Sequence, residues 1–409
     1  MHRRDFLRGT AAVLGTALGA RLGGPLVGTA RAATETSHLL FVYYHGGFNA
    51  VLGGAGSMFN NVAFGTTSSN LKAVGNGVFT DLATFGTLPQ VALDHWAAVG
   101  FRHGAPLHTQ PDNPNNGSEK AITRKGQTGA SYLTTLAAAM GGTSPLKAAH
   151  TGPYPYWRVQ PAAGGVSMQN ILDWGDVLKA VGADAAAVTG PTRDGAAASL
   201  EAAAAMSHGK LTANADSLGS LDDAYQASVA SLRQPAPPPI TKDEILTAYG
   251  LSSTNVSGFA AQMAAAEVMI RAAGSNVVTA WDGSYGEWDF NSGPSMTSSR
   301  AKLLGQSGYG VNKMAPLKTF CQRMLSLPDK NVVVVCLGDF VRLTVGHGHG
   351  DGCVAAVFGK YLKQGLNFPC DGAAKFGPST PGVDAFWASI AKALKVTGAP
   401  FGSSPYTYV

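Results

Sequence analysis

Runs of apolar residues bounded by polar ones form the clearest pattern in the chain. The most marked covers residues 332–337, where four consecutive valines lead into Cys336 and Leu337. A run of this kind is typical of a strand buried on both faces, as in a parallel sheet. Comparable runs predict three further strands, at 38–44, 97–101 and 276–281.

Apolar residues at helical spacing lie between these runs. The most regular stripe runs from Met314 to Leu325 and predicts an amphipathic helix that contacts the core. Other helices are expected at 128–140, 243–249, 257–273, 355–363 and 383–394, with a short one inside 79–96. Strands that alternate with helices over this length predict an α/β fold with a mainly parallel sheet.

Composition indicates an exported protein and gives no support for a nucleic-acid partner. Charged residues make up 13% of the chain, about half the usual ~25%. The formal net charge of +5 comes largely from residues 1–32, which hold five arginines and one aspartate. The remaining 25 basic and 24 acidic residues nearly cancel, so the mature chain has no net charge to attract an anionic polymer.

The N-terminus matches a twin-arginine export signal. Residues 2–8 pair two arginines with a following Phe-Leu and a further arginine, and 9–20 is weakly apolar. Small residues at 30–32 suit cleavage before Ala33. We therefore expect a signal peptide over 1–32, the twin-arginine export machinery as a partner, and a periplasmic or secreted mature protein without a stable membrane span. The alternative is an uncleaved signal anchor.

The rest of the chain, 33–409, is expected to form a single α/β domain with one insertion. Residues 178–233 are rich in alanine, and the proline-rich 234–239 reads as a stiff connector. We interpret about 178–239 as a helical insertion that serves packing or acts as a lid.

Four cysteines, at 321, 336, 353 and 370, allow three disulfide connectivities in an exported protein. Cys353 and Cys370 lie in loop-like sequence and are the preferred pair. Cys336 lies in a predicted core strand, where a small buried thiol is expected.

Side chains that bind metals follow the predicted strand at 332–337. His347, His349 and Asp351 alternate with glycine, and alternate residues of an extended segment point to one side. Asp339 and Arg342 lie closer to the strand end, where ligands bind in open α/β sheets. These groups could converge on one divalent cation; the alternative is a flexible polar surface turn.

Two other strand exits carry candidate side chains. The strand at 38–44 runs into His45, two glycines, Phe48 and Asn49, which could present a ligand or form only a tight turn. The strand at 97–101 is followed by Arg102, His103 and His108, which could reach the same site or lie in a solvated loop.

Several separated segments, in this order, resemble the domain-of-unknown-function 1501 family of exported bacterial proteins, which is related to the alkaline phosphatase and sulfatase superfamily. They are the N-terminal signal, 46–49, 286–291, 338–342, 349–352 and 359–365. The resemblance covers most of the mature chain in short islands, and the C-terminal block is the most specific part. It implies a three-layer α/β/α sandwich, alkaline-phosphatase-like, with a metal site at the carboxyl ends of the strands.

The resemblance also implies site residues, with several departures from the family pattern. Arg342 would hold an oxyanion or pair with Asp339. Asn49 stands where the family has Asp, Asn291 where it has His, and Asp339 where it has Glu. Losing a charged ligand and a histidine weakens a hard divalent site. The expected ligands of a divalent metal ion are Asn49, Asp289, Asp339, His347, His349 and Asp351.

Two functions follow as hypotheses. The first is a divergent metal-dependent hydrolase of phosphate or sulfate esters, which the clustered histidines and aspartates favour; its partner would be a small-molecule ester or a cell-envelope component. The second is a non-catalytic exported binding or assembly protein that keeps the hydrolase fold with a degenerate metal site, which the substituted ligands favour. We expect a divergent member that retains a metal site.

Overall fold

The structure is a computed structural model. It describes residues 35–56, 67–142, 144–153, 155, 158–181, 194–195, 197–203, 205, 240–283, 286–290, 295–306, 308–343 and 348–409. The chain divides into two compact units, one made of Met1–Thr34 and Val188–Pro235, the other of Glu35–Ala187 and Ala236–Val409. The predicted signal peptide and most of the alanine-rich insertion lie outside the described residues.

An eight-stranded, mostly parallel sheet forms the centre of the second unit, with the strand order β10-β4-β9-β8-β1-β7-β5-β6. Only β9 runs antiparallel to its neighbours, β4 and β8. The predicted α/β class is therefore confirmed, and each of the four predicted strands coincides with an observed one. The strands are β1 (Thr36–Asn49), β4 (Trp96–Arg102), β5 (Ala148–Thr151), β6 (Met168–Ile171), β7 (Val277–Asp282), β8 (Lys330–Phe340), β9 (Gly352–Phe358) and β10 (Gly365–Asn367).

The helix predicted at 355–363 is wrong, because β9 occupies residues 355–358 and the residues after it are not helical. The strand lies between β8 and β4 and is buried along its whole length. A short, unbroken apolar run has no polar face, so periodicity cannot separate a central strand from a buried helix. The helical interpretation failed for that reason.

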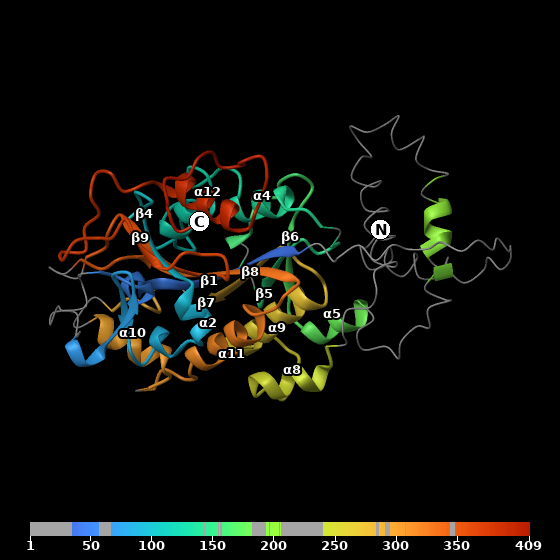
Figure 1. Ribbon diagram of the computed structural model, residues 1–409, viewed down its shortest axis with the longest axis horizontal. Helices are drawn as coiled ribbons and strands as arrows, with labels where there is room; N and C mark the ends of the chain where they lie inside the picture. The colour runs from blue at the N-terminus through green and yellow to red at the C-terminus, as the bar shows by residue number, and fades with distance from the viewer. Residues whose placement is uncertain are drawn as a thin grey trace. The chain divides into compact units, whose positions relative to one another are not determined.

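Helices cover both faces of the sheet (Figure 1). On one face, Trp387 of α12 (Val383–Ala393) stacks on Phe41 of β1 and on Tyr132 of α4 (Tyr132–Ala139). On the other, Phe259 of α9 (Phe259–Arg271) contacts Tyr44 of β1. Phe41 and Tyr44 differ by an odd number of positions and so point to opposite faces. The arrangement is compatible with a three-layer α/β/α fold.

The remaining elements complete these layers. The predicted stripe from Met314 forms α11 (Met314–Met324), whose apolar side chains are buried. The others are α2 (Gln90–Asp94), α3 (Ser118–Thr123), α5 (Trp174–Ala180), α8 (Lys242–Tyr249), α10 (Ser295–Leu303), the 3₁₀ turns η1 (Ala50–Gly53), η4 (Ser68–Asn70) and η5 (Phe85–Thr87), and the hairpin β2 (Leu71–Gly75) with β3 (Val78–Asp81). Among the described residues, no helix is long and apolar enough to span a membrane.

A buried carboxylate ties α8, α9 and α11 together. Glu267 is fully buried and accepts hydrogen bonds from Tyr249 (2.8 Å), Arg271 (2.6 Å) and Arg323 (2.8 Å from both Nε and Nη2). Hydrogen bonds to a charged group contribute about 1.5–3 kcal/mol each. We expect Arg323→Met to lower the free energy of unfolding by about 2 kcal/mol, measured by urea denaturation.

The matched control for Arg323 is an exposed ion pair. Lys179 and Asp176 lie 3.1 Å apart with side chains 68% and 75% exposed. Such pairs contribute about 0–1 kcal/mol, so Lys179→Met should leave the unfolding curve nearly unchanged. Equal effects of the two substitutions would show that the buried cluster does not stabilise the helical layer.

The four cysteines are free and buried, so the predicted Cys353–Cys370 disulfide is wrong. Burial raises the pKa of the Cys321 and Cys370 thiols to about 12. Burial likewise raises the pKa of Cys336 and Cys353. Thiols with such pKa values stay protonated at neutral pH and behave as small apolar groups.

Candidate metal centre

The centre lies where β1 and β8 end side by side. At this point β1 passes through Gly47, whose φ of +107° favours glycine. A Cβ added there would lie 2.6 Å from Arg342 Nη2, 2.8 Å from Asp289 Cα and 3.0 Å from His108 Cε1. The glycine backbone therefore allows three side chains from distant parts of the chain to pack against the strand end.

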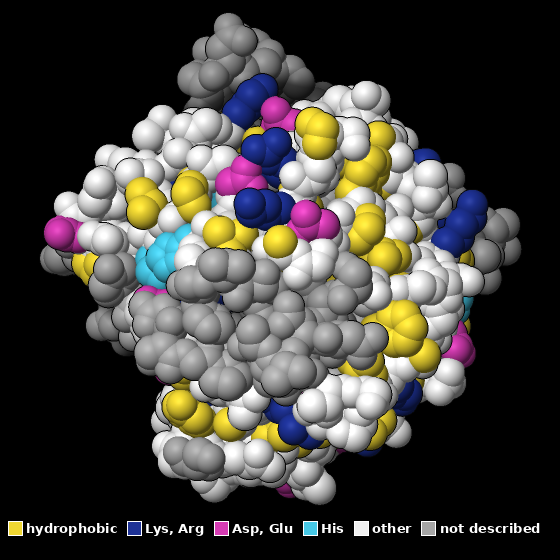
Figure 2. Space-filling model, turned by 90° about the vertical axis from the view of Figure 1, so that its left-hand side faces the viewer, with side chains coloured by type: hydrophobic (Ala, Val, Ile, Leu, Met, Phe, Trp, Pro, Cys, Tyr) yellow, Lys and Arg dark blue, Asp and Glu magenta, His cyan; other side chains and the backbone are white. Residues whose placement is uncertain are grey.

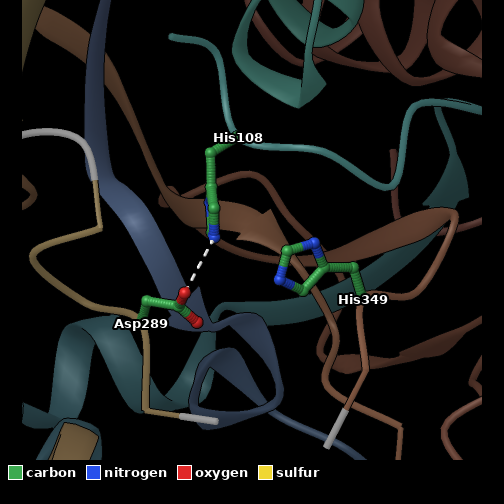
Figure 3. A group of neighbouring side chains, drawn as sticks. All are labelled: His108, Asp289 and His349. Atoms are coloured by element: carbon green, nitrogen blue, oxygen red, sulfur yellow. Dashed lines mark ion pairs between the residues drawn. The ribbon is translucent and has the colours of Figure 1, made fainter.

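His108, Asp289 and His349 form a group that could hold a metal ion (Figure 3). One ligand atom from each lies within 4.8 Å of the others. His108 Nε2 is 3.5 Å from Asp289 Oδ2, and the two imidazole rings meet edge to face with centroids 4.6 Å apart. The three residues come from the segments that follow β4, β7 and β8, so the sheet order brings them together.

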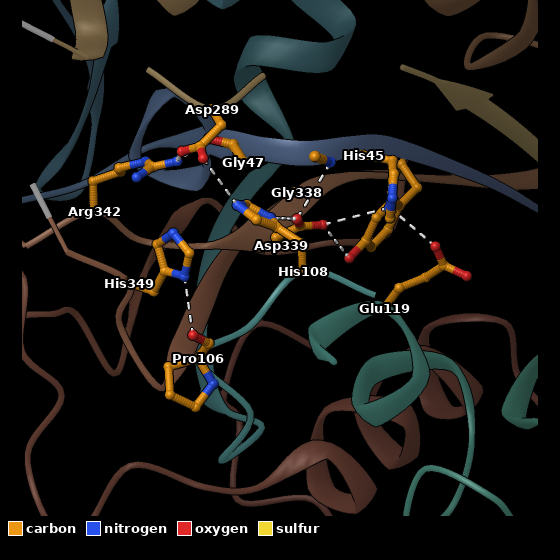
Figure 4. A network of polar contacts seen from close by, with 12 residues as sticks. His45, Gly47, Pro106, His108, Glu119, Asp289, Gly338, Asp339, Arg342 and His349 are labelled. Carbon is orange, nitrogen blue, oxygen red and sulfur yellow. Dashed lines mark hydrogen bonds and ion pairs between the residues drawn. The ribbon is translucent and has the colours of Figure 1, made fainter. Parts of the chain in front are cut away.

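Hydrogen bonds fix the orientation of both imidazoles (Figure 4). His349 Nδ1 lies 3.0 Å from the carbonyl oxygen of Pro106, which can only accept, so Nδ1–H is the donor. His108 Nδ1 lies 2.6 Å from Asp339 Oδ2 and donates in the same way. In both rings Nε2 is then the nitrogen available as a ligand. Histidines that bind metals usually donate their other N–H to a carboxylate or a carbonyl.

Asp339 supports His108 from behind the group. It is fully buried, and its carboxylate also accepts from the Tyr43 hydroxyl (2.7 Å) and the Gly46 N–H (3.2 Å). Burial alone would raise the pKa of Asp339, but the hydrogen bond from His108 and the nearby His45 hold that pKa well below its usual range. Asp339 is therefore an ionised acceptor that orients a ligand.

Arg342 places a fixed positive charge beside the group. Its side chain is fully buried, forms an ion pair with Asp289 and donates to the carbonyl of Gly47 (3.4 Å). Burial lowers the pKa of His349, and the charge of Arg342 adds to this effect. At neutral pH His349 is a neutral imidazole, the form that binds metals.

Two of the three residues, Asp289 and His349, are partly exposed to solvent. The Asp289 side chain is 23% exposed and His349 is partly exposed. Figure 2 shows histidine side chains reaching the surface on one face of the molecule, beside hydrophobic and charged groups. A small molecule could therefore reach the exposed edge of the group, at Asp289 and His349, whereas His108 is buried.

The other candidates from the sequence have different partners or lie outside the described residues. Asn49 is buried, and its side-chain oxygen accepts from the Val51 N–H at 3.3 Å, which caps η1. Asp351 accepts from Arg102 Nε at 2.9 Å in a half-exposed ion pair, outside the group. His347 lies outside the described residues. The structure thus brings together Asp289 and His349, with Asp339 and Arg342 directly behind them.

Two features of the centre were not in the ligand set expected from sequence. His108 follows a predicted strand and was noted as able to reach the site, but nothing in its spacing distinguished it from a solvated loop histidine. Glu119 lacks any local motif, and His45 was noted only as a residue at a strand exit. Their role depends on contacts between residues more than 70 positions apart.

The donor set fits a borderline divalent cation. Two imidazole nitrogens and one carboxylate match the three-ligand arrangement of catalytic zinc sites, which keep a position for water or substrate. The same set suits iron(II), with two histidines and one carboxylate. Calcium and magnesium prefer oxygen ligands and fit less well.

Comparisons with known proteins assign no family to this chain. No family model matches it, and neither does any curated protein or solved structure. The centre is therefore interpreted from its own geometry.

Proposed function

We propose that this protein is an exported, metal-dependent hydrolase of phosphate or sulfate esters, a divergent relative of the family that its motifs resemble. The observation that carries the proposal is the group His108, Asp289 and His349, with both imidazoles oriented by hydrogen bonds at Nδ1. Orientation of this kind is typical of a metal site and is costly to maintain for a solvated surface turn.

A bound divalent cation would polarise an ester oxygen and activate water for attack. The side chains of the centre would orient the ligands and hold the substrate. Asp339 would keep His108 in the tautomer that presents Nε2, and Pro106 would do the same for His349. Arg342 would hold a non-bridging oxygen of the substrate while remaining close to Asp289.

The charges of the centre favour an anionic substrate. Asp289 and Arg342 cancel each other, and the imidazoles of metal ligands are neutral. A divalent cation would leave the ligand group with a net positive charge, partly offset by Asp339 behind it. Phosphate and sulfate esters carry negative oxygens that match this charge, and an arginine fork suits their geometry.

The location of the centre agrees with the fold proposed from the resemblance. The ligands follow strand ends of a mostly parallel sheet covered by helices on both faces. Open α/β sheets place their sites at this edge. We further propose that the fold is an alkaline-phosphatase-like sandwich. The twin-arginine signal at 1–32 would export the protein across the inner membrane.

The test is elemental analysis of the purified mature chain, from Ala33 onward, followed by assays with p-nitrophenyl phosphate, bis(p-nitrophenyl) phosphate and p-nitrophenyl sulfate. We expect about one zinc or iron per chain and hydrolysis of at least one ester. A chelator should remove the activity, and added metal should restore it. A folded protein that stays metal-free in the presence of excess zinc would contradict the proposal.

One observation favours the alternative, a non-catalytic binding or assembly protein. Asp289 already pairs with Arg342, and Asn49 already caps a turn, so these polar groups are satisfied by the protein itself. In that case the centre would be a set of internal ion pairs at the strand ends. Metal-free, folded and inactive protein would support this second function.

A further inference from the structure

The polar contacts continue on the far side of Asp339, away from the metal group (Figure 4). His45 Nδ1 lies 3.0 Å from Glu119 Oε2 and 3.8 Å from Asp339 Oδ1. All three side chains are fully buried. The contacts therefore form a line from Glu119 through His45 and Asp339 to the ligand His108.

The position of the proton in this line follows from chemistry. Carboxylate oxygens only accept, so the His45 nitrogen that faces both Glu119 and Asp339 carries the proton. That nitrogen lies closer to Glu119 than to Asp339, so Glu119 is its nearer ion-pair partner. Arg158 Nε lies 3.3 Å from the same Glu119 oxygen, which fixes the position of this carboxylate from its other side.

Folding stability alone is a weak explanation for this line of buried ionisable residues. A buried ionic pair gains little over apolar side chains of similar volume, because desolvation offsets its attraction. The surrounding layer is built from such apolar side chains, including Phe41, Trp281 and Trp387. The presence of Glu119 and His45 behind Asp339 is therefore better explained by their effect on Asp339, which orients the ligand His108.

Asp339 has a limited capacity to accept hydrogen bonds. Its Oδ2 serves His108 and Gly46, while Oδ1 serves Tyr43 and faces His45. If His45 moved onto Oδ1, it would neutralise part of the carboxylate charge that holds His108. Glu119 competes for the same proton and holds the ring away.

We propose that Glu119 and His45 are positioning residues for the metal ligand His108. Glu119 holds the His45 proton, so that the Asp339 carboxylate keeps its full charge for His108 Nδ1–H. The inference rests on the proposed metal centre and adds to it two residues that touch no ligand atom. Residues that orient a metal ligand through hydrogen bonds typically change metal affinity by about 10–100-fold.

The first experiment measures the affinity of the metal-depleted mature chain for Zn²⁺ and Co²⁺ by titration calorimetry. Glu119→Gln keeps the shape and an acceptor oxygen but removes the charge. We expect the affinity for both metals to fall about 10-fold, at the lower end of the range for residues that orient a metal ligand. The visible absorption of the Co²⁺ form should change, and the proton resonance of His108 Nδ1–H should move upfield as its hydrogen bond to Asp339 weakens.

A double-mutant cycle tests whether Glu119 acts through His45. In the His45→Asn background no imidazole can move onto Asp339, so adding Glu119→Gln should cause no further loss of affinity. Residues in contact that act as one unit give this kind of non-additivity. If Glu119→Gln lowered metal affinity as much in the His45→Asn background as in the wild type, this mechanism would be overturned.

The control is Glu267→Gln, which alters another fully buried carboxylate between two arginines, on α9. It should lower stability and leave metal affinity and the His108 resonance unchanged. Wild-type protein that binds metal, with Glu119→Gln binding equally well, would overturn this inference alone. Wild-type protein that binds no metal would overturn the inference and the proposed function together.

Discussion

Asp289→Ala and His349→Ala are each expected to weaken the binding of Zn²⁺ by more than about 100-fold. This exceeds the effect of replacing residues that only orient a metal ligand. Each removes one of three ligand atoms that lie within 4.8 Å of one another. A site with two remaining ligands cannot complete the arrangement that catalytic zinc sites require. Ester hydrolysis should be lost together with the metal, measured by calorimetry and by elemental analysis after dialysis.

Asp289→Ala also leaves the buried Arg342 without its carboxylate, so the variant could unfold for reasons unrelated to metal. Asp289→Asn avoids this, because the amide oxygen still accepts from the guanidinium while the ligand charge is removed. Its metal affinity should fall strongly while its thermal unfolding stays close to that of the wild type. Retained affinity in this variant would remove Asp289 from the ligand set.

Asp351→Ala is the matched control for His349→Ala. Asp351 lies two residues away and was also expected as a ligand from sequence, but the structure pairs it with Arg102 in a half-exposed contact. The substitution should leave metal content and hydrolysis nearly unchanged. Loss of metal in Asp351→Ala would show that the loop after β8 reorganises around the cation.

The core strands could be predicted from sequence because burial on both faces leaves an unmistakable run of valine and other apolar residues. β1 and β8 are such runs, and both were located correctly. β9 has the same character, yet it was interpreted as a helix because its length and flanking residues did not separate the two structures. Only pairing with β4 and β8 decides in favour of the strand, and pairing is a property of the whole sheet.

Site residues could be predicted where they follow the end of a predicted strand or match a motif of the resembled family. Asp339, Arg342 and His349 stood out because ligands bind at the carboxyl ends of strands, whereas Asp289 was expected from the resemblance. The distinction between a ligand such as His349 and an ion-pair partner such as Asp351 depends on which way a glycine-rich loop turns. That direction is set by contacts with the segment after β4, which no local spacing encodes.

Two buried histidines give the protein a second measurable property, sensitivity to acid. His38 donates from Nδ1 to the carbonyl of Ser275 (2.7 Å), and His150 bonds through Nδ1 to the Thr279 hydroxyl (2.8 Å). Burial lowers the pKa of His38 to about 4, with Lys330 adding to the effect. Burial likewise lowers the pKa of His150 to about 3.

Stability should therefore fall steeply as pH decreases from about 6 to about 4. The unfolded chain takes up protons at these histidines near their ordinary pKa of about 6.5, whereas the folded chain does so only near the lowered values. These two histidines give a slope of about 3 kcal/mol per pH unit, and the buried His103, whose pKa burial also lowers to about 4, adds to it. Domains are typically stable by about 5–15 kcal/mol, so urea titrations across this range should show the midpoint moving toward zero.

His150→Asn separates this explanation from general acid unfolding. The substitution removes one of these titrating groups, so the slope between pH 6 and 4 should decrease by about 1.4 kcal/mol per pH unit, whatever the change in absolute stability. Carboxylates such as Asp339, whose pKa is also lowered in the folded state, contribute with the same sign but only near and below about pH 4. A slope that stays unchanged in His150→Asn would place the acid sensitivity outside the buried histidines, whereas a slope reduced by this amount would show that neutral imidazoles in the strands of the sheet set the lower pH limit of the fold.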